Sequence, residues 1–296
     1  MKIFDLGMNP YIQSLRLRTL PLSVSGIILG TGLAAADLGF QIYDLRFWLV
    51  FALAICTTLS LQILSNLSNE LGDALKGTDS AQQEREAYGL QSGALTEQSI
   101  RRMIGLFIGL SVLFGSALVW VALPLWSTAF FVFLGLGLLA IIGAMTYTLG
   151  KHNYGYKGLG DIGVFLFFGL LSTMGAYYLQ TQTMTYQVAL CGAAIGMPCV
   201  GVLNLNNIRD MRNDLTHGKR TLASRLGTNG SRIYHTVLLV LCLALFCLCG
   251  HFWTLCIVPI WAWHLWFVWS HHEKLDKQMP VLMLTTLAVA LLALIS

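Results

Sequence analysis

One short stretch of the sequence carries far more charge than its surroundings: Asn69-Glu70-Leu71-Gly72-Asp73-Ala74-Leu75-Lys76-Gly77-Thr78-Asp79. It follows the apolar run 47–65 and holds three acids, an amide, a lysine and two glycines, in a chain with only 11% charged residues. A second such stretch follows the apolar run 188–205 and reads Asn206-Asn207-Ile208-Arg209-Asp210-Met211-Arg212-Asn213-Asp214. We expect the two stretches to face each other across one pocket at a membrane surface.

The composition indicates the class of protein that surrounds these stretches. Of the 296 residues, 56% are hydrophobic and the mean hydropathy is +0.68. Soluble domains have about 25% charged residues, and a soluble chain with much less could not cover its own exterior. We therefore expect an integral membrane protein that contacts the lipid bilayer and binds no nucleic acid. The composition leaves its oligomeric state open.

Nine apolar runs are candidates to cross a bilayer, which takes about 20 residues of helix. The expected fold class is all-α: a polytopic membrane protein of nine transmembrane helices in a single domain, residues 1–296. A faint repeat of Asn-x3-Asp after the second and sixth runs suggests two related halves, about 1–150 and 151–296, with an extra last span. The expected spans are Thr19–Ala36, Phe47–Ser65, Met103–Leu123, Leu125–Leu149, Ile162–Leu179, Val188–Leu205, Ile233–Gly250, Phe252–Ser270 and Pro280–Ile295.

The distribution of charge predicts the orientation of these spans. If the N-terminus lies in the cytoplasm, every lysine and arginine except Arg46 falls on the cytoplasmic side. This bias follows the positive-inside rule, and a missed or an invented span would scramble it. We expect the protein in the inner (cytoplasmic) membrane of the cell, with its N-terminus and active site in the cytoplasm and its C-terminus on the far side.

The spacing within both charged stretches suits a hard cation. If the helix of the sixth span continues past the membrane, Asn206, Asp210 and Asp214 lie on one face, as do Asn69 and Asp73 after the second span. Magnesium usually takes one or two carboxylates together with substrate phosphates. We therefore predict that the two stretches together hold Mg²⁺ on a diphosphate. For either stretch alone, solvated loop carboxylates are the default explanation.

Other charged residues of the same loops extend this prediction. Gly77 would let the chain turn back and bring Asp79 to the metal. A diphosphate also needs direct positive partners, and lysine supplies a point charge for phosphate. The lysines that we expect to serve are Lys76, Lys151, Lys157 and Lys219. The alternative for each lysine is topological, because a lysine also anchors its loop on the inner side.

The loop between the fourth and fifth spans, residues 147–161, is rich in glycine and tyrosine. Glycines let a loop approach a ligand closely. Tyr147 and Tyr154 either stabilise a carbocation by cation–π attraction or belong to an aromatic belt at the interface. Asp161 either caps the following helix, or orients or deprotonates an acceptor hydroxyl.

Four stretches resemble the UbiA superfamily of membrane prenyltransferases, and the resemblance covers nearly the whole chain. Within the superfamily they are most similar to the branch that prenylates 1,4-dihydroxy-2-naphthoate for menaquinone synthesis. Members often have aspartate where this chain has Glu70, which is still a carboxylate and is kept among the predicted metal ligands. The four stretches are 16–21, 69–79, 154–161, and 204–214 with 218–223.

The resemblance implies a UbiA-like fold, with the nine helices around a central cavity that is open to lipid and suits a long isoprenoid tail. The residues that it implies for the Mg-diphosphate are Asn69, Asp73, Asp79, Asn207, Asp210 and Asp214, with Asn206 beside them. It places Arg18 and Lys157 near the diphosphate or the acceptor. The residues that we expect to act in catalysis are Asp73, Asp210, Asp161 and Lys157.

The activity implied by the resemblance is Mg²⁺-dependent prenyl transfer. An allylic polyprenyl diphosphate ionises, the ring of 1,4-dihydroxy-2-naphthoate attacks the allyl cation, and loss of carbon dioxide and a proton gives demethylmenaquinol. The alternative acceptors are 4-hydroxybenzoate, homogentisate and a geranylgeranylglycerol phosphate. A transporter is a remote alternative, because transporters keep ionisable residues near the bilayer midplane, whereas the acids here gather at one face. The length of the isoprenoid chain is left open.

Overall fold

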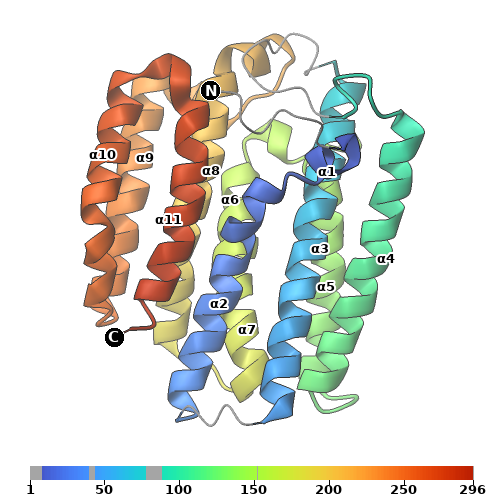
Figure 1. Cartoon of the computed structure of the whole chain (residues 1–296), viewed down its shortest axis with the longest axis vertical. Coiled ribbons are helices and arrows are strands. Elements are labelled where there is room, and N and C mark those ends of the chain that lie inside the picture. The colour runs from blue at the N-terminus through green and yellow to red at the C-terminus, as the bar shows by residue number, and fades with distance from the viewer. Residues whose placement is uncertain (1–8, 40–43, 78–88, 152, 296) are drawn as a thin grey trace.

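The computed structural model describes residues 9–39, 44–77, 89–151 and 153–295, without the side chains of 272–274, and these ranges form a helical bundle (Figure 1). No strand occurs within them, in agreement with the predicted all-α class. The α-helices are α1 (Pro10–Leu15), α2 (Leu20–Asp37), α3 (Leu45–Leu75), α4 (Glu97–Ala122), α5 (Thr128–Thr146), α6 (Gly160–Val164), α7 (Ser172–Thr181), α8 (Tyr186–Thr216), α9 (Leu222–Leu248), α10 (Val258–Ser270) and α11 (Gln278–Leu292). Shorter helical segments are η1 (Leu17–Thr19), η2 (Gly155–Lys157), the π-helix η3 (Phe165–Leu171), η4 (Phe252–Ile257) and η5 (His272–Lys277).

Nine helical segments within the described ranges are long and apolar enough to cross a membrane, and each overlaps one of the nine predicted spans. The fifth span is composite, because α6, η3 and α7 follow one another without a break. α9 begins at Leu222, well before the predicted Ile233. Its first turns are set off by a kink at Gly227, where φ is +68° and glycine avoids the strain that a side chain would bring.

The two charged stretches end the two longest helices. α3 and α8 have 31 residues each, and at 1.5 Å per residue each is about 46 Å long, against about 30 Å for the hydrocarbon core. Both helices therefore continue as helix past the apolar layer. Residues four apart share one helix face, so Asn69 and Asp73 lie together on α3, as Asp210 and Asp214 do on α8. The two related halves suggested by the sequence remain a prediction.

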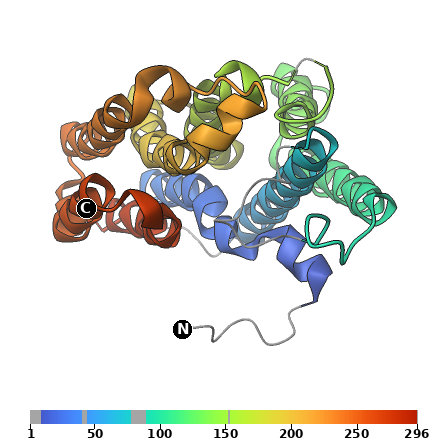
Figure 2. The ribbon, with the colours of Figure 1, turned by 90° about the horizontal axis from the view of Figure 1, so that it is seen from above.

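Glycines bring the central helices into close contact. Seen from above, α2 lies between α3 and α11, and it also packs against α7 (Figure 2). A Cβ atom on Gly30 of α2 would lie 2.1 Å from the carbonyl oxygen of Thr173 in α7. A Cβ on Gly169 of η3 would lie 2.7 Å from the backbone of Gly192 and of Gly196 in α8. Because lipid provides no hydrophobic drive between helices, close van der Waals packing at such small residues holds a membrane bundle together.

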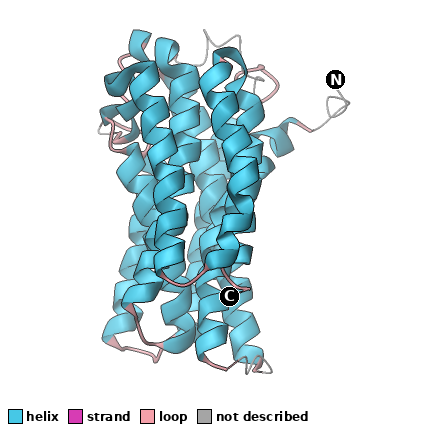
Figure 3. Cartoon of the chain, turned by 90° about the vertical axis from the view of Figure 1, so that its left-hand side faces the viewer, coloured by secondary structure: helices cyan, strands magenta, loops and turns pink. Residues whose placement is uncertain are grey.

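The connections of the bundle lie at its two ends (Figure 3). The N-terminal α1 and the loops after α3, α5, α8 and α10 share one end, while the C-terminus lies towards the other (Figure 1). Within the described residues, the lysines and arginines that the sequence assigned to one side lie in these loops or in the helical turns near them. Arg46 is at the opposite end and donates a hydrogen bond of 2.7 Å to the carbonyl oxygen of Ala122. The chain is thus a multi-pass membrane protein in which one end gathers most of the positive charge.

The packing at Gly30 predicts a selective loss of stability. Gly30→Ala should lower the unfolding temperature of the purified protein in detergent, because overpacking a tight contact costs about 1–3 kcal/mol. Gly105→Ala is the matched control, since no atom lies within 4 Å of its would-be Cβ and alanine is the better helix former. The explanation is wrong if thermal unfolding shows the same shift for both variants.

Candidate active site

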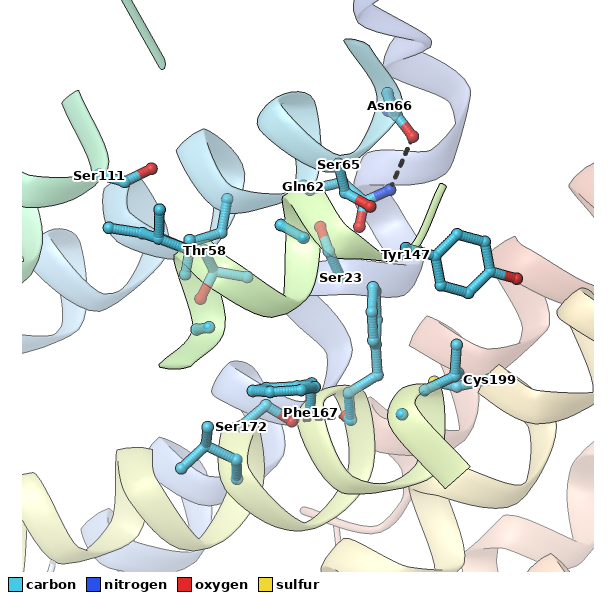
Figure 4. A pocket seen from close by; sticks show the side chains of 18 of the residues that line it. Ser23, Thr58, Gln62, Ser65, Asn66, Ser111, Tyr147, Phe167, Ser172 and Cys199 are labelled. Atoms are coloured by element: carbon cyan, nitrogen blue, oxygen red, sulfur yellow. Dashed lines mark hydrogen bonds between the residues drawn. The ribbon is translucent and has the colours of Figure 1, made fainter. Parts of the chain in front are cut away.

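A cavity of about 540 Å³ lies among α2, α3, α4, α5, η3, α7 and α8. This volume is in the range of small-molecule binding pockets. Figure 4 shows part of its wall, including Gln62 of α3, Tyr147 and Phe167. The cavity follows α3 from Asp73 to Ala54, about 28 Å at 1.5 Å per residue. It is polar at the charged end of the bundle and mainly apolar further in.

Both charged stretches reach the polar end of this cavity. The two stretches come from different helices and are more than 130 residues apart along the chain. Their meeting at one cavity was predicted from the sequence. The residues that line the cavity here are Asn69 and Asp73 of α3, Asn206, Asn207, Arg209, Asp210 and Asp214 of α8, and Lys219. The structure therefore brings the two stretches to one pocket, where a single ligand can contact both.

The loop between α5 and α6 is fastened to the end of α3. The hydroxyl of Thr148 donates to the side-chain oxygen of Asn69 at 3.1 Å, and the Thr148 carbonyl accepts from Nζ of Lys76 at 2.7 Å. This contact requires Gly72, because a Cβ atom there would lie 2.6 Å from the Thr148 hydroxyl. Burial lowers the pKa of the Lys76 ammonium; Asp73 opposes this effect and Lys219 adds to it.

Asp210 shares an arginine with a residue from another loop. Nε and Nη2 of Arg209 each lie 2.6 Å from one carboxylate oxygen of Asp210. Nη1 of the same guanidinium donates to Asp276 in η5. One guanidinium faces two carboxylates, so the side chains of Arg209, Asp210 and Asp276 together have a net negative charge. The group thus links the loop after α10 to the second charged stretch.

Asp214 and Lys219 form a buried ion pair at the end of α8. Nζ of Lys219 lies 3.2 Å from Oδ1 of Asp214. The buried carboxylate oxygens of Asp214 otherwise have no hydrogen-bond partner among the described residues. Burial alone would lower the pKa of Lys219, but the carboxylates of Asp214, Asp73 and Asp210 outweigh burial and raise it. Lys219 is therefore a fixed positive charge among three acids.

Neutral polar groups line the part of the cavity next to the charged residues. Nε2 of Gln62 donates to Thr19 and to Asn66, both at 3.1 Å, and the second bond is drawn in Figure 4. The rings of Tyr147 and Tyr154 meet edge to face, with centroids 5.2 Å apart. Burial raises the pKa of Tyr147, and it raises the pKa of Tyr154 to about 12. Both tyrosines therefore remain neutral phenols at physiological pH.

Comparison with known proteins now identifies the family. The model of the UbiA prenyltransferase family matches residues 25–294. This chain belongs to the UbiA prenyltransferase family. It is 44% identical over 257 residues to the 1,4-dihydroxy-2-naphthoate octaprenyltransferase of Escherichia coli K12, a match that covers 86% of this chain and 79% of that protein.

One further relative supports this membership, and a solved structure shows the same fold. The chain is 37% identical over 291 residues to the Haemophilus influenzae protein of the same name, covering 95% of this chain and 92% of that one. Among solved structures, a UbiA homologue from Archaeoglobus fulgidus bound to DMAPP and Mg²⁺ has the same fold, with a TM-score of 0.62 at 13% identity, over 97% of this chain and 99% of that one. The UbiA-like fold predicted from the sequence is thus confirmed.

The donor atoms at the polar end suit the kind of ion that the Archaeoglobus fulgidus homologue binds, Mg²⁺. Carboxylate and amide oxygens are the ligands that Mg²⁺ prefers, and Oδ2 of Asp214 is buried without a hydrogen-bond partner among the described residues. Yet no three side chains among the described Asp, Glu, His and Cys residues are close enough to hold a metal by themselves. Oxygens of a bound diphosphate would have to complete the coordination, as is usual for Mg²⁺.

Glu70, a predicted metal ligand, does not reach the cavity. Its carboxylate is fully buried and accepts hydrogen bonds from the hydroxyl of Ser14 at 3.1 Å and from the backbone N–H of Leu90 at 2.8 Å. Glu70 is the next residue after Asn69, and one residue turns an α-helix by about 100°. The side chain of Glu70 therefore points to a different side of α3 from that of Asn69. These contacts tie α1 and the chain at residue 90 to α3, so we assign Glu70 a structural role.

Other predicted site residues also lie away from the cavity wall. Lys151 and Lys157 are exposed, and the carbonyl oxygen of Lys157 accepts a hydrogen bond from Arg225 at 2.9 Å. Arg18 lines a small crevice of about 50 Å³ beside the cavity. Asp161 is buried in the first turn of α6, where its side chain accepts a hydrogen bond from Tyr234, and Leu159 occupies the N-cap position. The predicted ligand Asp79 is outside the described residues.

Sequence reasoning missed four residues that the structure places at the polar end. Thr148 and Tyr156 belong to the loop 147–161, but their partners follow only from the fold. Arg209 stands next to Asp210, and its charge was attributed to membrane topology alone. Asp276 lies in a loop where the sequence shows no motif that points to a binding site. For Arg209, adjacency to a motif aspartate was the one clue available in the sequence.

The placement of Glu70 predicts that its charge is dispensable for metal binding. Glu70→Gln retains a carbonyl oxygen that can accept both hydrogen bonds, so the Mg²⁺ concentration that half-saturates binding of inorganic diphosphate should not change. Asp73→Asn should raise that concentration, because Asp73 lines the cavity. Titration calorimetry in detergent measures both values. A higher Mg²⁺ requirement in Glu70→Gln would restore this residue to the metal site.

Proposed function

We propose that this protein transfers a polyprenyl group from an allylic polyprenyl diphosphate to 1,4-dihydroxy-2-naphthoate. The relatives from Escherichia coli and Haemophilus influenzae carry this activity in their names, at 44% and 37% identity over most of both chains. One observation in the structure supports it most: a single cavity joins a polar end with acids and a lysine to a long apolar interior. A molecule with a charged head and a hydrocarbon tail fits such a shape.

The diphosphate lies at the polar end in this proposal. Asp73, Asp210 and Asp214 would hold Mg²⁺, and Lys219 would bind phosphate oxygen directly. The metal, when bound, stabilises the negative charge of the departing diphosphate. Lys219 keeps its proton because three carboxylates surround it, so it can neutralise the same charge. The isoprenoid tail extends along α3 towards Ala54.

The residues next to the diphosphate protect and orient the reacting carbons. Phe167, Phe168 and Tyr147 line the cavity, and their rings can face an allyl cation without attacking it. Apolar walls exclude the water that would otherwise trap the cation. The acceptor ring forms a bond to the allylic carbon, its carboxyl group leaves as carbon dioxide, and one proton is released. No strong base is needed, which fits the neutral tyrosines.

We also propose an orientation for this site. The end of the bundle that contains the polar end of the cavity carries the charged loops (Figure 1), and Arg46 lies at the start of α3, at the other end. By the positive-inside rule the charged end faces the cytoplasm, where both substrates' charged groups would be soluble. The bilayer would then be the inner membrane of the cell.

Removal of either central carboxylate tests the proposed chemistry. Asp73→Ala and Asp210→Ala should each lower Mg²⁺-dependent prenyl transfer by about 100-fold or more, because each removes charge that is needed where the diphosphate departs. Glu97→Ala is the matched control, since this exposed acid at the same end pairs only with Arg101 among the contacts described. Turnover is measured with radiolabelled prenyl diphosphate in membranes. Near-normal turnover in both aspartate variants would refute the mechanism.

The acceptor is tested by competition between aromatic acids. With one prenyl diphosphate, 1,4-dihydroxy-2-naphthoate should react faster than 4-hydroxybenzoate or homogentisate, because its second ring buries more apolar surface in the cavity. Initial rates for each acceptor, measured with the same enzyme preparation, give the comparison. A clear preference for 4-hydroxybenzoate would leave prenyl transfer intact but overturn the proposed acceptor.

A further inference from the structure

Tyr156 contacts the polar end of the cavity from behind. It lies in η2, within the loop between α5 and α6, and the residue is 9% exposed. Its hydroxyl donates a hydrogen bond of 2.9 Å to Oδ1 of Asp73. Its carbonyl oxygen accepts from the backbone N–H of Arg220 at 3.0 Å. One residue therefore joins the end of α3 to the loop that follows α8.

The ring of Tyr156 also gathers two lysines from different parts of the chain. Nζ of Lys76 lies 3.7 Å from the ring centroid, and Nζ of Lys219 lies 5.6 Å from it. Both distances are within the range of cation–π attraction. Two ammonium groups this close to one another repel, so an electron-rich ring between the loops offsets part of that repulsion. The lysines can then stay together before an anion arrives.

The position of Tyr156 separates its role from those of the neighbouring tyrosines. Tyr147 and Tyr154 line the cavity, whereas Tyr156 is not part of its wall. From the sequence, tyrosine rings of this loop are expected either to stabilise a carbocation or to form an aromatic belt at the interface. The ring of Tyr156 instead faces ammonium groups of the protein. It therefore acts through Asp73 and the lysines and not on substrate directly.

We propose that Tyr156 is a positioning residue with two separable effects on diphosphate binding. Its hydroxyl holds the Asp73 carboxylate in the orientation needed for the metal, and its ring holds Lys76 and Lys219 side by side as one anion-binding pair. This inference rests on the proposed function, because it assumes that the polar end binds a diphosphate. It adds a residue from the α5–α6 loop to the two charged stretches.

Two substitutions separate the two effects. Tyr156→Phe keeps the ring and loses the hydroxyl, so the Mg²⁺ concentration that half-saturates diphosphate binding should rise by about tenfold, as for loss of a hydrogen bond to a charged group. Its affinity for diphosphate at saturating Mg²⁺ should remain that of the wild type. Tyr156→Leu loses both features, so its affinity should fall by about fivefold or more even at saturating Mg²⁺.

The measurement is isothermal titration of the full-length protein in detergent with inorganic diphosphate, at a series of Mg²⁺ concentrations. Tyr186→Phe is the matched control, because Tyr186 is 74% exposed at the start of α8, at the opposite end of the helix from the charged stretch. Its binding should equal that of the wild type. Equal Mg²⁺ requirements for Tyr156→Phe and the wild type would overturn the role of the hydroxyl.

A double-mutant cycle tests the role of the ring even if Tyr156→Leu lowers the unfolding temperature. In a Lys76→Gln background the ring has lost one of its two cations, so Tyr156→Leu should cost less affinity than in the wild type. The same loss in both backgrounds would overturn the role of the ring. If the wild type itself does not bind diphosphate, the proposed function fails; if it binds and the variants match it, only the role of Tyr156 fails.

Discussion

Repulsion between carboxylates is the constraint on which this structure depends. Asp73 comes from α3, Asp210 and Asp214 come from α8, and all three line the same end of one cavity. Three acids gathered in a partly buried site would separate unless positive charge lay among them. The protein supplies it through Lys219, which is 3.2 Å from Asp214, and through Arg209, which bridges Asp210 to Asp276. A metal ion on a bound diphosphate would supply further positive charge to balance the remaining negative charge.

The rest of the bundle can be understood as the frame that holds these groups in place. α3 and α8 extend past the apolar layer as continuous helix, so their last turns are fixed by the packing of the spans below them. Glycine contacts such as Gly30 against Thr173 and Gly169 against Gly196 bring the central helices close together. The loop after α5 then closes over the helix ends, with Thr148 and Tyr156 bound to Asn69 and Asp73. Rigid helices thus set the positions of the acids, and short polar contacts set their orientations.

Much of this could be predicted from the sequence, because the signals were local. Hydropathy gave the nine spans, and a four-residue spacing put Asp210 and Asp214 on one helix face. Because the two charged stretches fall on the same side of the membrane, the sequence suggested that they meet at one pocket. The failures have a common physical cause, since they depend on which surfaces meet. Glu70 was assigned to the metal because members of the family often have aspartate at this position, yet the helix turns it towards Ser14. The contacts of Asp276 and Tyr156 join loops that are distant in sequence, so they became visible only in the fold.

The most direct test of this account is the location of metal ions in the complex. Crystals grown with Mn²⁺ and an unreactive polyprenyl diphosphate analogue would show each metal by its anomalous scattering. The account predicts metal bound to diphosphate oxygens and, at the same time, to carboxylates of both α3 and α8, with the hydrocarbon tail along α3 towards Ala54. Metal and diphosphate on one helix alone, or outside the cavity, would contradict it.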